Sequence, residues 1–440
     1  MVTSIIGSGI FFTTGFMLKD LDSPAGILFC WFLGGIFAIS GALTYSYPAV
    51  LFPRAGGDYI YLKEAFSPLL AFMSGWSSLL ANLTANISVL ALAFGDHVLI
   101  LFPSLKDFVF LKEDIFGLKL EFGSLQIISI LLVLFFTYIN VRGVKQAVKV
   151  QNFITGIKLG GLILFIVVGY FFGNKTGSLN LSSGSLSFEG IALGLVPVTF
   201  SYLGWNMITY LAGEVENPSR NIPFSILLSC LITMGIYLSI NLLYLLSAPL
   251  EELQGRDGIG VIAAKAMFGP EVGILFTFFI LWMVAGSLSS ILMGASRVYY
   301  AMAKDSVFFP SLADLHPNYG TPYKSLYFQS VYASVLLLFG NIQSLIFMIT
   351  CAVFLLSTLT ALSVFKLKRN HPELAYKLPL YPFPPLLFAS GNLVLIIYLT
   401  YNSWQNTVWG LGLSLSGIPV YFLFRKFYPS VRETFPSSNI

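Results

Sequence analysis

Charged side chains are scarce in this chain of 440 residues. Lys and Arg supply 24 positions and Asp and Glu supply 20, together 10% of the sequence, whereas soluble domains average about 25%. Hydrophobic residues make up 56%, and the mean hydropathy is +0.81. Apolar stretches of about 20 residues, long enough to cross a bilayer, recur from end to end. These features exclude a sizeable soluble domain and predict a polytopic membrane protein.

Cysteine and histidine are also rare. The cysteines all fall within predicted spans, as small core residues do, without the spacing of a disulfide framework or a metal site. The histidines lie at span ends or in loops and form no ligand cluster. The residues concerned are Cys30, Cys230, Cys351, His97, His316 and His371. We therefore expect no metal and no cofactor.

The hydropathy pattern predicts an all-α membrane protein with about twelve transmembrane helices. The first span is short, and the eighth is long enough to project from the bilayer. The expected spans are residues 1–18, 24–52, 65–102, 124–141, 150–172, 190–213, 222–247, 268–304, 325–340, 343–366, 383–401 and 407–427.

Positive charge predicts the orientation of these spans. The loops after even-numbered spans and the C-terminal tail hold 15 Lys and Arg residues, against 7 in the opposite loops. Cytoplasmic loops carry the excess of positive charge, so both termini are expected in the cytoplasm, with the protein in the cell (inner) membrane. The net charge of +4 reflects this topology and does not indicate a nucleic acid partner.

The first span contains the sequence SIIGSGIFFTTG, from Ser4 to Gly15. Glycine within a helix costs about 0.8–1 kcal/mol relative to alanine, and an unwound backbone in a membrane must line protein or water. One interpretation is a broken helix at Gly7, Ser8 and Gly9, whose free N–H groups suit a carboxylate. The other is that small residues allow two helices to pack closely.

A second interruption favours the broken-helix interpretation. The sequence FSYLGWN, from Phe200 to Asn206, places Ser201, Gly204 and Asn206 at a similar depth in the sixth span. Paired breaks in corresponding positions of two halves indicate a transporter binding site. Spans one and six cross the membrane in opposite directions, as an inverted repeat requires.

Four motifs resemble signatures of the amino acid–polyamine–organocation superfamily: IIGSGIF, PRAGGDYIYLKEAF, FSYLGWN…GEVENPSRNIP and GASRVYYAMAKD. Within it, the chain is most similar to prokaryotic members of the L-type amino acid transporter group. The resemblance implies a LeuT-type fold with discontinuous helices 1 and 6. Residues 1–174 and 188–368 would then form a five-plus-five inverted repeat, with residues 380–428 as two peripheral helices.

The resemblance also implies roles for residues at the two breaks. Ser8 and Gly9 would offer backbone N–H groups to the α-carboxylate of an amino acid. The carbonyls of Ile5 and Phe200, with Leu203 as a further candidate, would accept from its α-ammonium. The expected substrate site comprises Ile5, Gly7, Ser8, Gly9, Phe200, Ser201, Leu203, Trp205 and Asn206.

Trp205 and Asn206 are expected to shape the side-chain pocket and gate. Some relatives have a smaller residue than Leu203 at its position, so a narrower pocket for small or medium neutral amino acids is expected.

Lys158 lies deep in the fifth predicted span. An intramembrane lysine is costly, by about 2.5–3.5 kcal/mol, and is a functional candidate by default; the alternative is a lysine that snorkels to the interface. In the resembling family, a lysine here occupies the place of a sodium ion. It would bridge a carbonyl near Gly7 to a hydroxyl on the eighth span, with Ser287 as the candidate among Ser287, Ser289 and Ser290.

A cluster of charged residues follows the sixth span. We expect Glu214, Glu216 and Arg220 to join Arg54 or Arg297 in a gating latch, although a solvated loop explains the same residues. The loop PRAGGDYIY is expected to turn at Gly56 and Gly57.

Together these features predict a secondary transporter that moves neutral L-amino acids by alternating access, as a sodium-independent exchanger. The alternatives are proton-coupled uptake of amines or polyamines and a nontransporting sensor on the same fold. An intramembrane enzyme needs paired titratable groups or a metal, and Lys158 is the only clear mid-membrane charge, so no catalytic residue is expected.

The expected partners are an amino acid substrate and the lipid bilayer. The loop at residues 103–123 lacks cysteine, so no disulfide-linked heavy subunit is expected. Only six residues precede Gly7, fewer than in the resembling family. This predicts that the true start lies upstream or that the chain is truncated, and otherwise that the cytoplasmic gate is abnormal.

Overall fold

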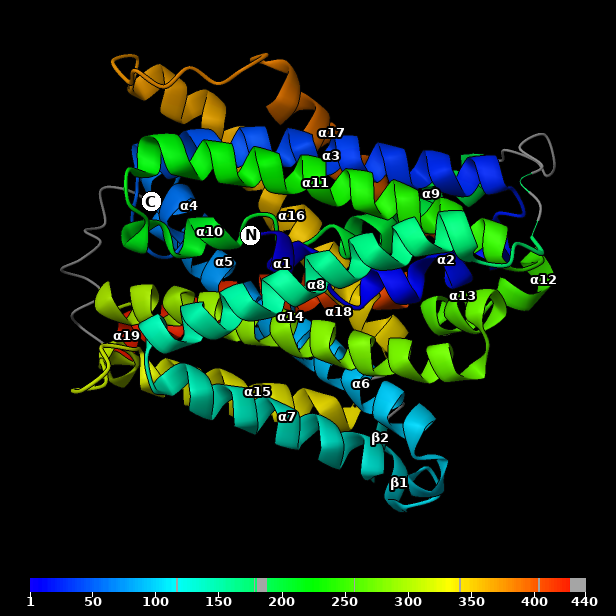
Figure 1. Ribbon diagram of the computed structural model, residues 1–440. Coiled ribbons are helices and arrows are strands. Elements are labelled where there is room, and N and C mark those ends of the chain that lie inside the picture. The colour runs from blue at the N-terminus through cyan, green and yellow to red at the C-terminus, as the bar shows by residue number, and fades with distance from the viewer. Residues whose placement is uncertain are drawn as a thin grey trace.

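The computed structural model describes residues 1–115, 118–177, 179, 188–256, 258–339, 342–402 and 404–427. Helices dominate these residues, and long helices lie side by side along one common direction (Figure 1). In the order of the chain, the elements are α1 (Val2–Ile5), η1 (Gly9–Phe11), α2 (Thr13–Asp20), α3 (Pro24–Leu51), α4 (Asp58–Ala65), α5 (Pro68–Leu80), α6 (Leu83–Leu101), η2 (Pro103–Leu105), β1 (Val109–Ile115), β2 (Leu118–Gly123), α7 (Ser124–Val141), α8 (Val144–Phe172), α9 (Phe188–Ser201), α10 (Met207–Tyr210), η3 (Ala212–Glu214), α11 (Pro218–Ser247), α12 (Leu250–Leu253), α13 (Ile259–Phe268), α14 (Pro270–Lys304), η4 (Pro310–Ala313), α15 (Tyr323–Phe339), α16 (Ile342–Asn370), α17 (Phe383–Asn402), α18 (Trp404–Leu415) and α19 (Gly417–Phe427).

Proline sets the start of several long helices. Proline is tolerated at the first helical position, where its missing N–H has no partner to lose. Ser23 precedes Pro24 and caps α3 by accepting from the amide of Gly26 at 3.2 Å. Ser67 precedes Pro68 and caps α5 in the same way.

Nine segments of the described chain are long and apolar enough to cross a membrane, which supports a multi-pass membrane protein. Two further expected spans, residues 1–18 and 190–213, are interrupted and therefore consist of short pieces. The remaining one corresponds to α15, whose 17 residues extend about 25 Å. The 35 residues of α14 extend about 52 Å and exceed the ~30 Å hydrocarbon core, as expected.

The third expected span needs correction. The third span, expected to be continuous over residues 65–102, is broken between α5 and α6 at Ala81 and Asn82, where Asn82 has φ −119° and ψ −88°. The amide of Asn82 reaches back to the carbonyl of Ser77 at 3.0 Å, which keeps it paired. Helix α8 begins at Val144, and its candidate membrane-spanning part, Gln151–Phe172, agrees with the fifth expected span.

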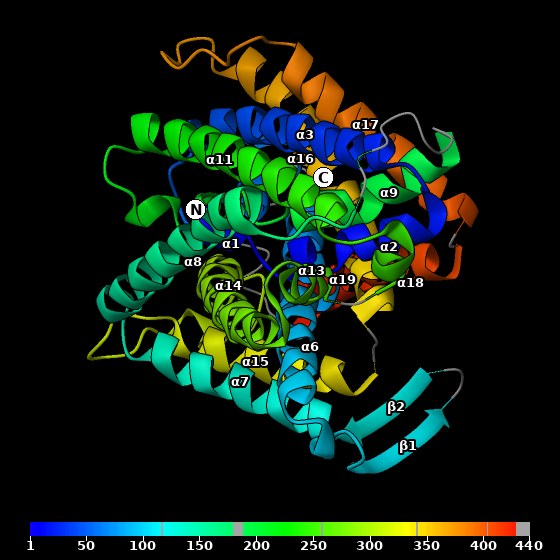
Figure 2. The same cartoon turned by 45° about the vertical axis from the view of Figure 1, so that its right-hand side comes forward.

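A β-hairpin also departs from the expected all-α architecture. Strands β1 and β2 pair in antiparallel fashion within the loop expected at residues 103–123. The hairpin projects from the end of the bundle next to α6 (Figures 1 and 2). Its pairing satisfies backbone groups that a long irregular loop would leave to solvent.

The interrupted segments lie inside the bundle. Figure 2 shows α1 among longer helices, with α8, α11 and α14 around it, while α2 packs against α9. Residues of α1 contact α8, α11 and α14, and Thr3, Ser4 and Ile5 are buried. The first interrupted segment therefore lies in the interior of the bundle.

Candidate functional site

Both interruptions expected from the sequence are present. The first span ends as a helix at Ile5, Ile6 is extended with φ −73° and ψ 90°, and a short 3-10 turn begins at Gly9. The sixth span ends as a helix at Ser201, and residues 202–206 form turns before α10. Each span therefore exposes backbone groups within the bundle.

The two breaks touch each other, and glycine makes this approach possible. A Cβ atom on Gly9 would lie 2.9 Å from the Cα atom of Ser201, and one on Gly204 would lie 2.8 Å from the carbonyl carbon of Ser4. Gly204 also has φ +99°, a conformation that side chains disfavour. The close-packing interpretation and the broken-helix interpretation therefore both describe this structure.

Tyr237 of α11 holds the breaks together. Its hydroxyl lies 3.1 Å from the carbonyl oxygen of Ile5 and 2.9 Å from that of Ser201, and it donates to both. The side chain is fully buried. Nothing in the sequence distinguishes this residue, because its spacing along α11 is that of any core aromatic.

A small cavity, which we call the cradle, lies at the meeting point of the breaks and encloses about 290 Å³. It contains eight of the residues expected from the sequence, and Asn86, Leu90, Ser4 and Ile291 were not anticipated. Its lining residues are Ser4, Ile5, Gly7, Ser8, Gly9, Asn86, Leu90, Phe200, Ser201, Leu203, Ser287 and Ile291.

The cradle offers main-chain donors but no charged side chain among its described lining residues. The amides of Ser8 and Gly9 form no hydrogen bond with any described residue. The hydroxyl of Ser8 is buried and has no partner there either. Buried polar groups normally have partners, so these three donors are available to a bound anion.

The carbonyl oxygens that were expected to accept from an ammonium group each already accept one hydrogen bond. The carbonyl of Phe200 accepts from the amide of Leu203 at 3.0 Å, and that of Ile5 accepts from Tyr237. A carbonyl oxygen has two acceptor sites, so each oxygen keeps one for a ligand.

Lys158 is wholly buried beside the first break. Its ammonium donates to the carbonyls of Thr3 at 3.0 Å and Ile6 at 2.5 Å, and to the Ser287 hydroxyl at 2.8 Å. Ser287 in turn lies 3.2 Å and 3.0 Å from the same two carbonyls. The contact expected between the first break and the eighth span is therefore present, with Ser287 rather than Ser289 or Ser290 as the hydroxyl.

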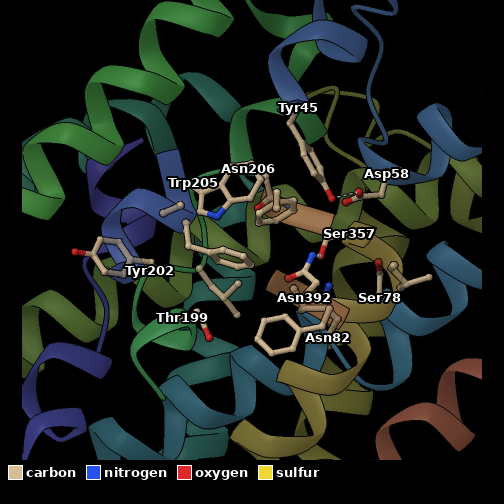
Figure 3. Close-up of a pocket in the computed structure, with 18 of the residues that line it drawn as sticks. Tyr45, Asp58, Ser78, Asn82, Thr199, Tyr202, Trp205, Asn206, Ser357 and Asn392 are labelled. Carbon is tan, nitrogen blue, oxygen red and sulfur yellow. Dashed lines mark hydrogen bonds between the residues drawn. The ribbon is translucent and has the colours of Figure 1, made fainter. Parts of the chain in front are cut away.

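Trp205 and Asn206 line a different cavity, which we call the Trp205 cavity. It encloses about 600 Å³ and shares one described lining residue, Leu203, with the cradle. Figure 3 shows Trp205 and Asn206 facing it, while the hydroxyl of Tyr202 points away. The lining residues are Gly34, Phe37, Ala38, Tyr45, Asp58, Ser74, Ser78, Asn82, Thr199, Tyr202, Leu203, Trp205, Asn206, Val353, Phe354, Leu356, Ser357, Phe388 and Asn392.

The expected cluster of charged residues is only partly present. The Glu214 carboxylate pairs with the Arg297 guanidinium at 3.1 Å, and Arg297 also donates to a backbone carbonyl of α14. Arg54 instead pairs with Glu64 at 2.6 Å. Arg220 is exposed and forms no ion pair with another described residue.

A family model described as amino acid permease matches residues 1–423. The chain belongs to this family. It is 30% identical over 434 residues to the serine/threonine exchanger SteT of Bacillus subtilis (strain 168), an alignment that covers 97% of the chain and 94% of that protein. The match agrees with the superfamily expected from the four motifs, and it places the chain among membrane transporters rather than enzymes.

Two human relatives extend the comparison. The large neutral amino acids transporter small subunit 2 is 26% identical over 435 residues, covering 96% of the chain and 78% of that protein. The cystine/glutamate transporter is 27% identical over 431 residues, covering 96% and 83%. These relatives support amino acid transport as the function of the family member described here.

Proposed function

We propose that the chain exchanges neutral L-amino acids across the cell membrane by alternating access, without sodium. The observation that carries this proposal is the cradle. The unpaired amides of Ser8 and Gly9, with the Ser8 hydroxyl, suit an α-carboxylate, and the free acceptor sites of Ile5 and Phe200 suit an α-ammonium. An uncharged lining favours a substrate whose side chain is also uncharged.

Sodium independence is proposed from the position of Lys158. Unwound backbone carbonyls of discontinuous helices are sodium ligands in secondary transporters. Here the carbonyls of Thr3 and Ile6 and the hydroxyl of Ser287 are occupied by a fixed ammonium. A lysine that supplies the positive charge removes the need for a dissociable cation.

The wider arrangement is proposed from the paired breaks and the family. Residues 1–174 and 188–368 form the two inverted repeats of a twelve-span LeuT-type fold, and residues 380–428 form the peripheral helices. Residues 116, 117, 257, 340, 341, 403 and 428 of these ranges lie outside the described part. Both termini face the cytoplasm. The pair of Glu214 and Arg297 then latches the cytoplasmic end of α10 to α14, and the chain works without a disulfide-linked heavy subunit.

The test is counterflow in liposomes that contain the purified protein. Vesicles loaded with one unlabelled amino acid are placed in a labelled panel of small, branched, aromatic, acidic and basic amino acids. We expect accumulation of neutral amino acids that is equal in sodium and in choline buffers and that collapses when the internal amino acid is omitted. Uptake that requires sodium, or that proceeds into empty vesicles only with a pH gradient, contradicts the proposal.

A further inference from the structure

Asp58 is a buried carboxylate at the edge of the Trp205 cavity. Its side chain accepts from the hydroxyls of Tyr45 at 2.5 Å, Thr360 at 2.6 Å and Tyr210 at 2.8 Å, and Figure 3 shows the Tyr45 contact. Asp58 forms no ion pair with any residue in the described ranges. A carboxylate offers about four acceptor positions, so one stays open, and a buried anion without a cation is costly.

Asn392 of α17 supplies a second unfilled acceptor. The residue is fully buried, and its amide nitrogen donates to the Ser357 hydroxyl at 3.0 Å. Its amide oxygen has no donor within the described part of the chain. In Figure 3 the Asn392 side chain reaches into the cavity from the opposite side to Trp205. A buried acceptor of this kind calls for a ligand that donates hydrogen bonds.

The cavity wall contains several aromatic rings but no Lys, Arg or His among its described residues. The rings of Tyr45 and Trp205 lie 4.9 Å apart, and that of Phe388 lies 5.8 Å from Trp205. Aromatic faces attract organic cations as well as apolar groups. The lining therefore combines one anion, unfilled acceptors and aromatic surface, and lacks the positive charge that would complement them.

A metal ion fits this site poorly. The three hydroxyl groups around Asp58 direct their protons at its carboxylate, and the described residues contain no cluster of three metal-binding side chains.

We propose that the Trp205 cavity is a second binding site, which takes an organic ammonium ion with an apolar or aromatic side group. Asp58 is its counter-ion, and the amide oxygen of Asn392 is an additional acceptor. Leu203 separates this site from the cradle. Two kinds of ligand supply such an ammonium group: a free amine, or an amino acid that has left the cradle. The second kind rests on the proposed function.

The first experiment measures binding of phenethylamine to the full-length protein by titration calorimetry. This amine lacks the carboxylate that the cradle amides would hold. We expect one equivalent to bind, and we expect Asp58→Asn to weaken it about 10- to 100-fold, the effect of losing a charged hydrogen bond. Asn392→Leu is similar in size and removes the unfilled acceptor at the cost of one hydrogen bond to Ser357, so the protein should still fold and should bind the amine more weakly. Ser289→Ala, on α14 away from the cavity lining, serves as the matched control.

A second titration with phenylalanine distinguishes the two kinds of ligand. If two equivalents of phenylalanine bind to the native protein and one binds to Asn392→Leu, the ligand of the site is an amino acid in transit. If one equivalent binds to both proteins, and phenethylamine binding depends on Asp58, the ligand is a free amine. Absence of phenethylamine binding at millimolar concentration, or binding unchanged in both Asp58→Asn and Asn392→Leu, overturns the site. If phenethylamine binds in a manner that depends on Asp58 but no amino acid binds, the proposed function is refuted and the proposed ammonium site is supported.

Discussion

Replacing Lys158 by methionine tests the first break directly. The ammonium makes three hydrogen bonds, to Thr3 at 3.0 Å, Ile6 at 2.5 Å and Ser287 at 2.8 Å. A hydrogen bond to a charged group contributes about 1.5–3 kcal/mol. Methionine keeps an unbranched apolar chain in the same space but can donate to none of these atoms.

The three contributions do not simply add. The Ser287 hydroxyl lies 3.2 Å and 3.0 Å from the carbonyls of Thr3 and Ile6, so it remains as a donor after the ammonium is gone. We therefore take the loss of a single charged hydrogen bond, about 2 kcal/mol, as the smallest effect. If the break must stay ordered for transport, this corresponds to a rate about 30-fold lower.

The assay is the initial rate of amino acid counterflow in liposomes with equal amounts of inserted protein. We expect Lys158→Met to fall at least about 30-fold. Ser289→Ala is the control, because Ser289 lies two residues from Ser287 and accepts from Asn140 instead of Lys158. A monodisperse Lys158→Met protein that keeps a third or more of the native rate would refute the role assigned to the lysine.

Three further predictions follow from the cradle and the latch. Leu203→Ala should join the cradle to the Trp205 cavity and shift the ratio of phenylalanine to serine counterflow upward by about 10-fold, in the range that a few methylene groups provide; an unchanged ratio would show that Leu203 is not the wall. Tyr237→Phe should slow counterflow about 5- to 30-fold, since two buried carbonyls lose a donor worth about 1–2 kcal/mol, and a native rate would contradict this. Arg297→Gln should slow counterflow at least about fivefold, because it removes the buried guanidinium that links Glu214 to the Met293 carbonyl of α14. The exposed Arg220→Ala should stay within about twofold; equal effects of the two variants would argue against the latch.

The sequence predicted the breaks because the signal is local. Gly7, Ser8 and Gly9 interrupt an apolar run, and Gly204 does so again in the sixth span. Lys158 was equally visible, since a single charge amid apolar residues stands out whatever the fold. The hydroxyl it meets required a choice among three serines, and that choice depends on the rotation of α14 about its axis, which the resemblance indicated.

Other features depend on contacts between distant segments and could not be read locally. The break at Asn82 has neither glycine nor proline within the sequence LLANLTAN, so only the packing around it reveals the interruption. Arg54 was one of two arginines expected beside Glu214 and Glu216, but it pairs with Glu64, ten residues away. The separation of the cradle from the Trp205 cavity depends on the direction of the Leu203 side chain, which the local sequence does not predict.

The hydroxyl of Tyr237 has a consequence for how the molecule can move. A phenol carries one hydrogen, yet here that hydrogen is divided between the carbonyls of Ile5 and Ser201. The bifurcated bond lasts only while both carbonyl oxygens stay within hydrogen-bond distance of the hydroxyl. If the two interrupted segments separate, the Tyr237 hydroxyl can donate to only one of the two carbonyls. The segment that keeps this hydrogen bond then moves together with α11.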